Sequence, residues 1–246
     1  MDNSDFTNPI NQRNNASGKT VATNDYIFDR WRAASAGTIE FDKNGYVPKI
    51  TTNQTIIKNP YVGKTLTAVL WFADGTKVVR SGVVPDTDDW TNIIVSTGNM
   101  TITTQNDKLM FRIAINESHT IAHAALYVGE YNDNNCPQYV PKGYAEELYA
   151  CRRYYRQYDN CFVIGYMHTT TQFSMPIDAW GMTGKPTITN FSPMWLYLSD
   201  GGSIDLANIG TPVATSQGRA NITIAVENTR RITGSLFAHF GLSCEI

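Results

Sequence analysis

The chain has 246 residues, of which 42 % are hydrophobic and 17 % are charged, and its formal net charge is −2. Such a chain can bury a substantial core, so it is not intrinsically disordered, and it lacks the basic surplus with which proteins neutralise nucleic-acid phosphates. No apolar run approaches the roughly 18 residues that a membrane-spanning helix needs. We therefore expect a globular protein whose partners include neither nucleic acid nor a membrane. Its surface, rich in Thr, Asn and Ser, suits sugars or contacts with other subunits.

The first residues and the cysteines indicate the compartment in which the chain folds. The opening MDNSDFTNPINQR has neither the charged n-region nor the apolar h-region of a signal peptide. We expect synthesis in a cytoplasm, where cysteines stay reduced as free thiols. The four cysteines, none in a CxxC pair, are Cys136, Cys151, Cys161 and Cys244.

Short β-patterned runs separated by turn residues begin the chain. Residues 1–30 are polar and rich in turns, and the run YIFDRW at 26–31 is the first firm strand that we expect, with Trp31 in the core. The run 65–72 alternates, so that Leu66, Ala68, Leu70 and Phe72 share one face while Trp71 faces solvent. Asp74-Gly75 then predicts a hairpin turn into a strand at 76–84.

Two further strands complete the first β series. The run 108–115 has Leu109, Phe111, Ile113 and Ile115 on one face, which is typical of a half-buried antiparallel strand. The run 121–129 is apolar on both faces. Together these runs, at this spacing, predict a β-sandwich.

One stretch has helical character, YAEELYACRRYY at 144–155. Tyr144, Leu148, Cys151 and Tyr155 fall on one face at helical spacing. The acidic first turn and the arginines near the end complement the helix dipole. So short a helix needs a surface to pack on, and we expect it to join two β units.

A second series of strands follows the helix. We expect strands at 162–167, 170–175, 187–191, 195–199, 222–226 and 236–244. The chain is thus predicted to be all-β, with a sandwich over residues 1–140, a linking helix over 141–158 and a C-terminal antiparallel β domain over 159–246.

No motif predicts catalysis or a cofactor. His119 and His123 form HTIAH, but Thr120 stands where a zinc protease has Glu, and on a strand the two histidines lie about 13 Å apart. Facing carboxylates would suffice for a glycosidase, and Asp86, Asp88, Asp89 and Glu117 are the candidates. The same aspartates leave a Ca²⁺ site open, although a solvated turn is the simpler interpretation. We expect no enzyme and no metal or other cofactor.

Three tryptophans are the candidates for sugar contact, namely Trp71, Trp90 and Trp180. Trp71 alternates with core residues, and Trp90 and Trp180 lie in loop-like sequence beside Asp or Gly. An exposed ring beside Asp or Asn offers a sugar both an apolar face and hydrogen-bond partners. The alternative is that these rings close the ends of the sandwich or contact other subunits.

The segments 3–6, 8–13 and 26–31, together with 146–148 and 151–155, carry a resemblance. They read NSDF, NPINQR, YIFDRW, EEL and CRRYY. This combination resembles a family of bacteriophage virion proteins found in tail fibres, tail tips and related appendages. Its members pair a jelly roll like that of carbohydrate-binding modules with a "QRYY" helix and a C-terminal β domain. The order of elements matches over nearly the whole chain, whereas the motifs cover a small part of it.

The chain departs from the family pattern at three places. Asn14 stands where the family often has Gly, Arg152 stands where it usually has Gln, and a longer loop at 129–137 precedes the helix. No sugar-contact motif is matched, so a ligand site does not follow from the resemblance.

The resemblance implies a virion protein made in the cytoplasm of a bacterial host. Its expected partners are copies of itself, most simply in a homotrimer, other virion proteins and host-surface polysaccharide. Tyr154, Arg152, Arg153 and Arg156 are the expected interface residues, because Tyr and Arg are enriched at interfaces. An appendage component that binds glycan is the first hypothesis. A capsid decoration or head-fibre protein without sugar binding, a glycan depolymerase and a carbohydrate-binding module outside phages are the alternatives.

Overall fold

Antiparallel sheets form nearly all of the regular structure, and α1 (Tyr144–Arg152) is the only α-helix among the described residues. The computed structural model describes residues 1–169, 172–184, 186–198, 203–205, 219–225 and 233–244. The prediction of an all-β chain with one short helix is confirmed. The chain divides into two compact units, Met1–Leu148 and Tyr149–Glu245, and the division falls inside α1.

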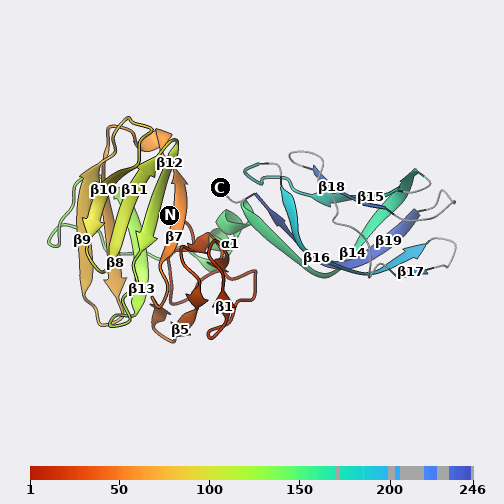
Figure 1. Cartoon of the computed structure of the whole chain (residues 1–246), viewed down its shortest axis with the longest axis horizontal. Coiled ribbons are helices and arrows are strands. Elements are labelled where there is room, and N and C mark those ends of the chain that lie inside the picture. Colours follow the sequence, from red (N-terminus) through yellow and green to blue (C-terminus); the bar gives the residue numbers. More distant parts are fainter. Residues whose placement is uncertain (170–171, 185, 199–202, 206–218, 226–232, 245–246) are drawn as a thin grey trace. The chain divides into compact units, whose positions relative to one another are not determined.

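The first unit is a β-sandwich of two facing antiparallel sheets (Figure 1). In order across the sheet, the six-stranded sheet contains β10 (Thr91–Ser96), β11 (Met100–Gln105), β12 (Lys108–Ile113), β7 (Thr52–Ile57), β3 (Trp31–Ala33) and β2 (Tyr26–Phe28). The five-stranded sheet contains β5 (Glu40–Asp42), β6 (Gly45–Val47), β13 (Ile121–Val128), β8 (Thr65–Phe72) and β9 (Lys77–Val83). The remaining elements of this unit are β1 (Thr20–Val21), its partner β4 (Gly37–Thr38) and the 3₁₀ turn η1 (Asn59–Tyr61).

Alternate residues of both sheets meet in one core. The predicted face of 65–72 and the residues Leu109, Phe111 and Ile113 of β12 are all buried in it, as is Trp31. The β8–β9 hairpin turns at Asp74-Gly75 as predicted, with Gly75 at φ +85°. Ile115 is a correction, because β12 ends at Ile113 and Ile115 is 51 % exposed beyond it.

The run 26–31 is not the single strand that its apolar pattern predicts. It contains β2 and the start of β3, which pair with each other through a tight turn at Asp29-Arg30. Arg30 has φ 71°, a conformation that few residues other than Gly and Asn adopt, so pattern alone does not reveal the turn.

The N-terminal motif residues form a buried network around this turn. Asn3 donates through its amide to the carbonyls of Ile10 (2.8 Å) and Asp29 (2.6 Å) and accepts a bond from the Ile10 amide (2.6 Å). The Asp29 carboxylate accepts bonds from Gln12 (2.6 Å) and Arg13 (2.9 Å). These residues therefore hold the first 30 residues onto the sandwich, and their role here is structural.

The helix is shorter than predicted. α1 ends at Arg152, and Tyr155 begins strand β14 (Tyr155–Thr169). The predicted apolar face holds for Cys151 and Tyr155, which are 0 % and 1 % exposed, but Tyr144 is 58 % exposed. In the first turn Glu147 accepts a hydrogen bond from the backbone amide of Asn3, which fastens the helix start to the N-terminal segment.

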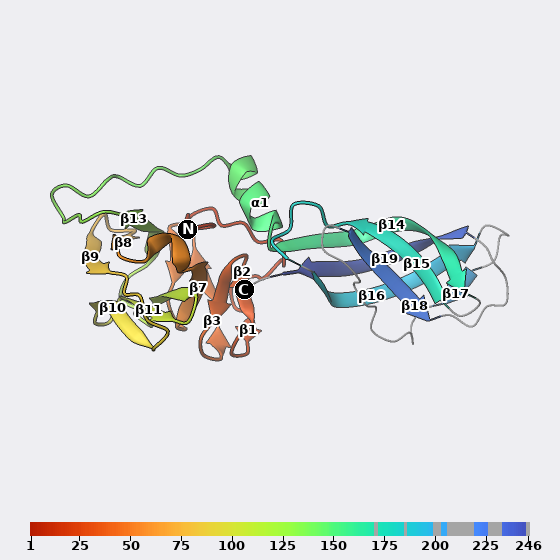
Figure 2. The same ribbon diagram turned by 90° about the horizontal axis from the view of Figure 1, so that it is seen from above.

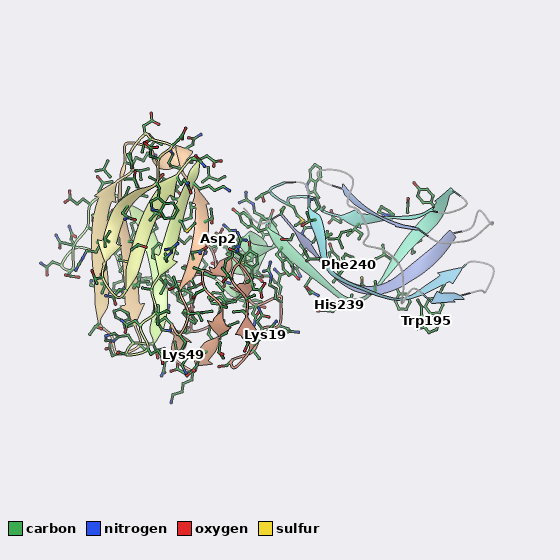
Figure 3. All side chains as sticks on the ribbon, viewed as in Figure 1. Asp2, Lys19, Lys49, Trp195, His239 and Phe240 are labelled. Atoms are coloured by element: carbon green, nitrogen blue, oxygen red, sulfur yellow. The ribbon has the colours of Figure 1, made fainter. Side chains whose placement is uncertain are left out.

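The second unit is built on one six-stranded antiparallel sheet. Across the sheet the strands are β17 (Ser203–Asp205), β16 (Thr187–Leu198), β19 (Thr233–Ser243), β14, β15 (Gln172–Asp178) and β18 (Arg219–Ala225). Figures 1 and 2 show the sheet strongly curved, with β15 and β18 folded over β16 and β19. Phe240 lies on the concave side, where it stacks on Tyr158 at 4.8 Å, while His239 and Trp195 lie on the convex side (Figure 3).

Most of the predicted strands of this unit are present with different bounds. The runs 187–191 and 195–199 form one strand, β16, that continues through Pro193 with register shifts on both sides of it. Positions 170, 171, 199 and 226 of the predicted strands lie outside the described residues.

Candidate functional site

Trp180 lies in the turn that follows β15. The Asp178 carboxylate accepts a bond from the Trp180 amide at 2.9 Å, as Asp does when it initiates a turn. Gly181 follows with φ +78°, which a residue with a side chain adopts only at a cost. This local geometry leaves the Trp180 indole 79 % exposed.

Arg156 holds this turn in place. Its guanidinium donates to the carbonyls of Asp178 (3.0 Å) and Trp180, and its Nε donates to the carbonyl of Arg152 (3.1 Å). The hydroxyl of Tyr158 also donates to the Asp178 carbonyl, at 3.0 Å. The end of α1, the start of β14 and the Trp180 turn are thereby joined into one site within the second unit.

A cavity of about 430 Å³ opens between these three segments. Its lining residues are Tyr149, Arg152, Arg153, Arg156, Gln157, Tyr158, Asp178, Trp180 and Gly181. The structure therefore brings together four residues singled out from the sequence for two different reasons, Trp180 for sugar contact and the three arginines for subunit contact.

The cavity is cationic. Asp178 is the only carboxylate in the lining, and it lies 3.7 Å from Arg156. Arg152 and Arg153 are exposed, and neither makes an ion pair with any described residue. Burial raises the pKa of Tyr158, so its phenol is neutral at physiological pH. Two guanidinium groups that pair with no described carboxylate thus lie beside an exposed indole.

The other two candidate tryptophans lie in the first unit, on different sheets. Trp71 of β8 is half-buried, because Tyr139 from the long segment between β13 and α1 packs on it with ring centroids 5.6 Å apart. Figure 2 shows this segment passing along the outside of the unit. Trp90 precedes β10, is 49 % exposed and borders a separate groove on the six-stranded sheet.

Tyr154 is half-buried and does not line the cavity, whereas Tyr149 and Tyr158, which the sequence interpretation did not single out, do line it. Tyr149 lies three and four residues before Arg152 and Arg153 and seven before Arg156. On a helix that continued to Arg156 this spacing would form one stripe, but α1 ends at Arg152, so helical spacing accounts only for Tyr149 and Arg152. Nothing in the sequence links this stripe to Asp178 and Trp180.

The histidines have separate carboxylate partners. His119 lies 3.8 Å from Asp74, and His123 lies 3.3 Å from Asp5. Across the described ranges no group of three or more His, Cys, Asp or Glu side chains is placed to hold a metal ion.

The four cysteines, all in the described part of the chain, form no disulfide. Among the described helices, none has the length and apolar character required to cross a membrane.

Comparisons of the chain with protein-family models, with curated proteins and with solved structures found no match.

Proposed function

We propose that this protein is a structural component of a bacteriophage virion appendage and that it binds host-surface glycan through the Trp180 cavity. The observation that supports binding most directly is the exposed Trp180 indole beside Arg152 and Arg153, which pair with no described carboxylate. The resemblance of the N-terminal and helix motifs supports the virion setting. The two-sheet sandwich of the first unit, which is consistent with a jelly roll, supports it as well.

The chemistry of the cavity favours a sugar that carries a negative charge. An indole face stacks on the apolar face of a pyranose ring. A guanidinium fork binds a carboxylate or a phosphate through two parallel hydrogen bonds, which neutral sugars do not offer. The Asp178 carboxylate, 77 % exposed, accepts bonds from sugar hydroxyls. A glycosidase uses two facing carboxylates, and Asp178 is the one carboxylate among the described lining residues, so the proposal is binding rather than cleavage.

The proposed partners include further copies of this chain, as in a homotrimer, and other virion proteins made in the same bacterial cytoplasm. The support is an exposed apolar row on the convex side of the second unit's sheet. Its residues are Phe162, Ile164, Tyr166, Trp195 and Tyr197, which are 41–72 % exposed. Phe162 and Trp195 both pair with position 237 of β19, so strands β14 and β16 present them on the same face. An uncharged surface of this kind is best covered by an equally apolar one, which a second copy supplies.

The same apolar row favours the second candidate function, a capsid decoration or head-fibre protein that assembles without binding sugar. The two candidates differ in the role of the Trp180 cavity. A glycan depolymerase is the third candidate, and release of reducing ends from host polysaccharide by the purified protein would select it.

The test is retention of the purified protein on host-type cells and on isolated cell-wall polysaccharide. Trp180→Ala and the double variant Arg152→Gln/Arg153→Gln are compared with Tyr144→Ala and Arg80→Gln, which change an exposed aromatic residue and an exposed arginine outside the cavity. We expect both cavity variants to lose retention by about tenfold or more, since each removes contacts worth about 1–3 kcal/mol. If all five proteins were retained equally, or if the folded wild type were not retained, the result would contradict glycan binding by the cavity and support a capsid decoration protein.

A further inference from the structure

The outer face of the six-stranded sheet in the first unit carries a row of polar side chains in exact cross-strand register. Arg112 of β12 and Arg32 of β3 both pair with Asn53 of β7, which lies between them. Thr101 extends the row on one side and Tyr26 on the other. Residues directly opposite each other in an antiparallel sheet point to the same face, so the two arginines flank Asn53 about 10 Å apart, two strand spacings.

No carboxylate of the first unit neutralises the two guanidinium groups. Residues 1–148 are described throughout, and none of their carboxylates pairs with Arg32 or Arg112. Among the described residues, the buried Nε of Arg112 has no hydrogen-bond acceptor, and its Nη2 contacts the sulfur of Met110 at 3.7 Å. Arg32 lies over the Tyr26 ring at 5.3 Å and makes one long bond, 3.4 Å, to the Asn24 carbonyl. Both side chains are only half-buried, so an anionic group from outside the protein can approach guanidinium groups that no carboxylate of residues 1–148 pairs with.

A groove of about 330 Å³ adjoins this row on the same sheet. Arg32 lines this groove. Thr55 and Thr103, which both pair with Met110 of β12 and so lie two residues along from the arginine row, add hydroxyl groups to the lining. At the far side Lys108 adds a second positive charge, which Asp107 partly offsets, and the half-exposed Trp90 ring completes the lining. The groove therefore combines an aromatic face, hydroxyls and cations on a flat support.

We infer that this face of the first unit is a second binding site, for an acidic oligosaccharide laid across β12, β7 and β3. The anionic groups of the sugar bind Arg112 and Arg32, Asn53 bonds to hydroxyls between them, and the Trp90 ring stacks on a sugar at one end. The shared chemistry is a carboxylate or a phosphate carried on a sugar chain, because both match the guanidinium fork. The inference does not depend on the Trp180 cavity, which belongs to the other unit.

Isothermal titration tests this site in the Arg152→Gln/Arg153→Gln protein, in which the Trp180 cavity is disabled. The probes are oligogalacturonate, which carries carboxylates, glycerol-phosphate polymer, which carries phosphates, and neutral maltotetraose. Arg32→Gln/Arg112→Gln is compared with Arg80→Gln, an exposed arginine on the opposite sheet. We expect the first pair to weaken binding of an acidic probe by about tenfold or more and the control to leave it unchanged within about twofold.

The relative affinities of the two acidic probes distinguish a uronic-acid source from a phosphate-bearing source. Trp90→Ala, which changes a residue just before β10 and outside its paired positions, gives a second readout if the double arginine variant does not fold, and we expect it to weaken binding as well. Binding that is equal in Arg32→Gln/Arg112→Gln and Arg80→Gln would overturn the inference. So would maltotetraose that binds as tightly as the acidic probes, or no binding of either acidic probe.

Discussion

Replacement of Asp29 by Ala is expected to destabilise the first unit severely. The Asp29 side chain is 0 % exposed, and its carboxylate accepts charge-assisted bonds from Gln12 at 2.6 Å and Arg13 at 2.9 Å. Two such bonds contribute about 1.5–3 kcal/mol each. Loss of these bonds leaves the Arg13 guanidinium, 11 % exposed, without this counter-charge, and removal of one partner of a buried pair costs about 3–5 kcal/mol in total, the lost bonds included. We expect the free energy of unfolding to fall by about 3–5 kcal/mol.

Urea unfolding followed by tryptophan fluorescence measures this loss. A Trp180→Phe/Trp195→Phe background removes the signals of the second unit, so that the buried Trp31 dominates the change in emission. Asp133→Ala, at an exposed loop position, is the matched control, for which we expect a change within about 0.5 kcal/mol. If Asp29→Ala costs no more than Asp133→Ala, the N-terminal motif does not hold the segment on the sandwich and its structural role is refuted.

Three further changes test separate parts of the structure. Burial alone would raise the pKa of Asp5, but its hydrogen bonds, above all the one with His123, lower this pKa below the ordinary 3.8. The ionised Asp5 carboxylate therefore stabilises the fold above pH 3.8, and this stabilisation is lost as pH falls through the lowered pKa. Asp5→Asn should therefore cost up to about 1 kcal/mol at pH 7 and progressively less as pH falls below 3.8, whereas a cost independent of pH would contradict the pairing. Ile164→Glu places a charge in the convex apolar row and should reduce the mass measured by light scattering to that of one chain, and a wild type that is already monomeric would contradict self-association. Tyr139→Ala uncovers Trp71 and should increase acrylamide quenching of tryptophan emission, and unchanged quenching would show that the ring is not covered.

Local rules account for the parts of the fold that the sequence predicts well. The β8–β9 hairpin follows from an Asp-Gly turn between alternating runs, and the burial of Phe111 follows from alternation along β12. These rules fail where a single backbone angle or a bulge determines where a strand begins or ends. Arg30 at φ 71° splits an apolar run into two strands, and bulges on both sides of Pro193 let β16 continue where a proline normally ends a central strand.

The sequence identifies Trp180 and the arginines as candidate residues, but it does not predict that they lie in one site. The exposure of Trp180 follows from its turn sequence, and the three arginines are close together in the chain, although α1 ends at Arg152 and Arg156 lies on β14. Their meeting depends on Arg156, which bonds to a turn more than 20 residues further along the chain, and no pattern records that contact. Trp71 shows the opposite case, because alternation assigns it to the outer face correctly while Tyr139 from a distant segment covers it.

The most direct test of the central claim is the indole signal of Trp180 in ¹H–¹⁵N NMR spectra during titration with acidic oligosaccharide. The chain has 5 tryptophans, and the signal that disappears in Trp180→Phe identifies the one in the cavity. The spectra are recorded in the Arg32→Gln/Arg112→Gln protein, so that sugar binding to the outer sheet face of the first unit does not contribute to the titration. We expect a saturable shift of the Trp180 signal that Arg152→Gln/Arg153→Gln abolishes. A Trp180 signal that does not move at any concentration of acidic sugar, while the protein stays folded, would contradict the assignment of the cavity as a glycan site.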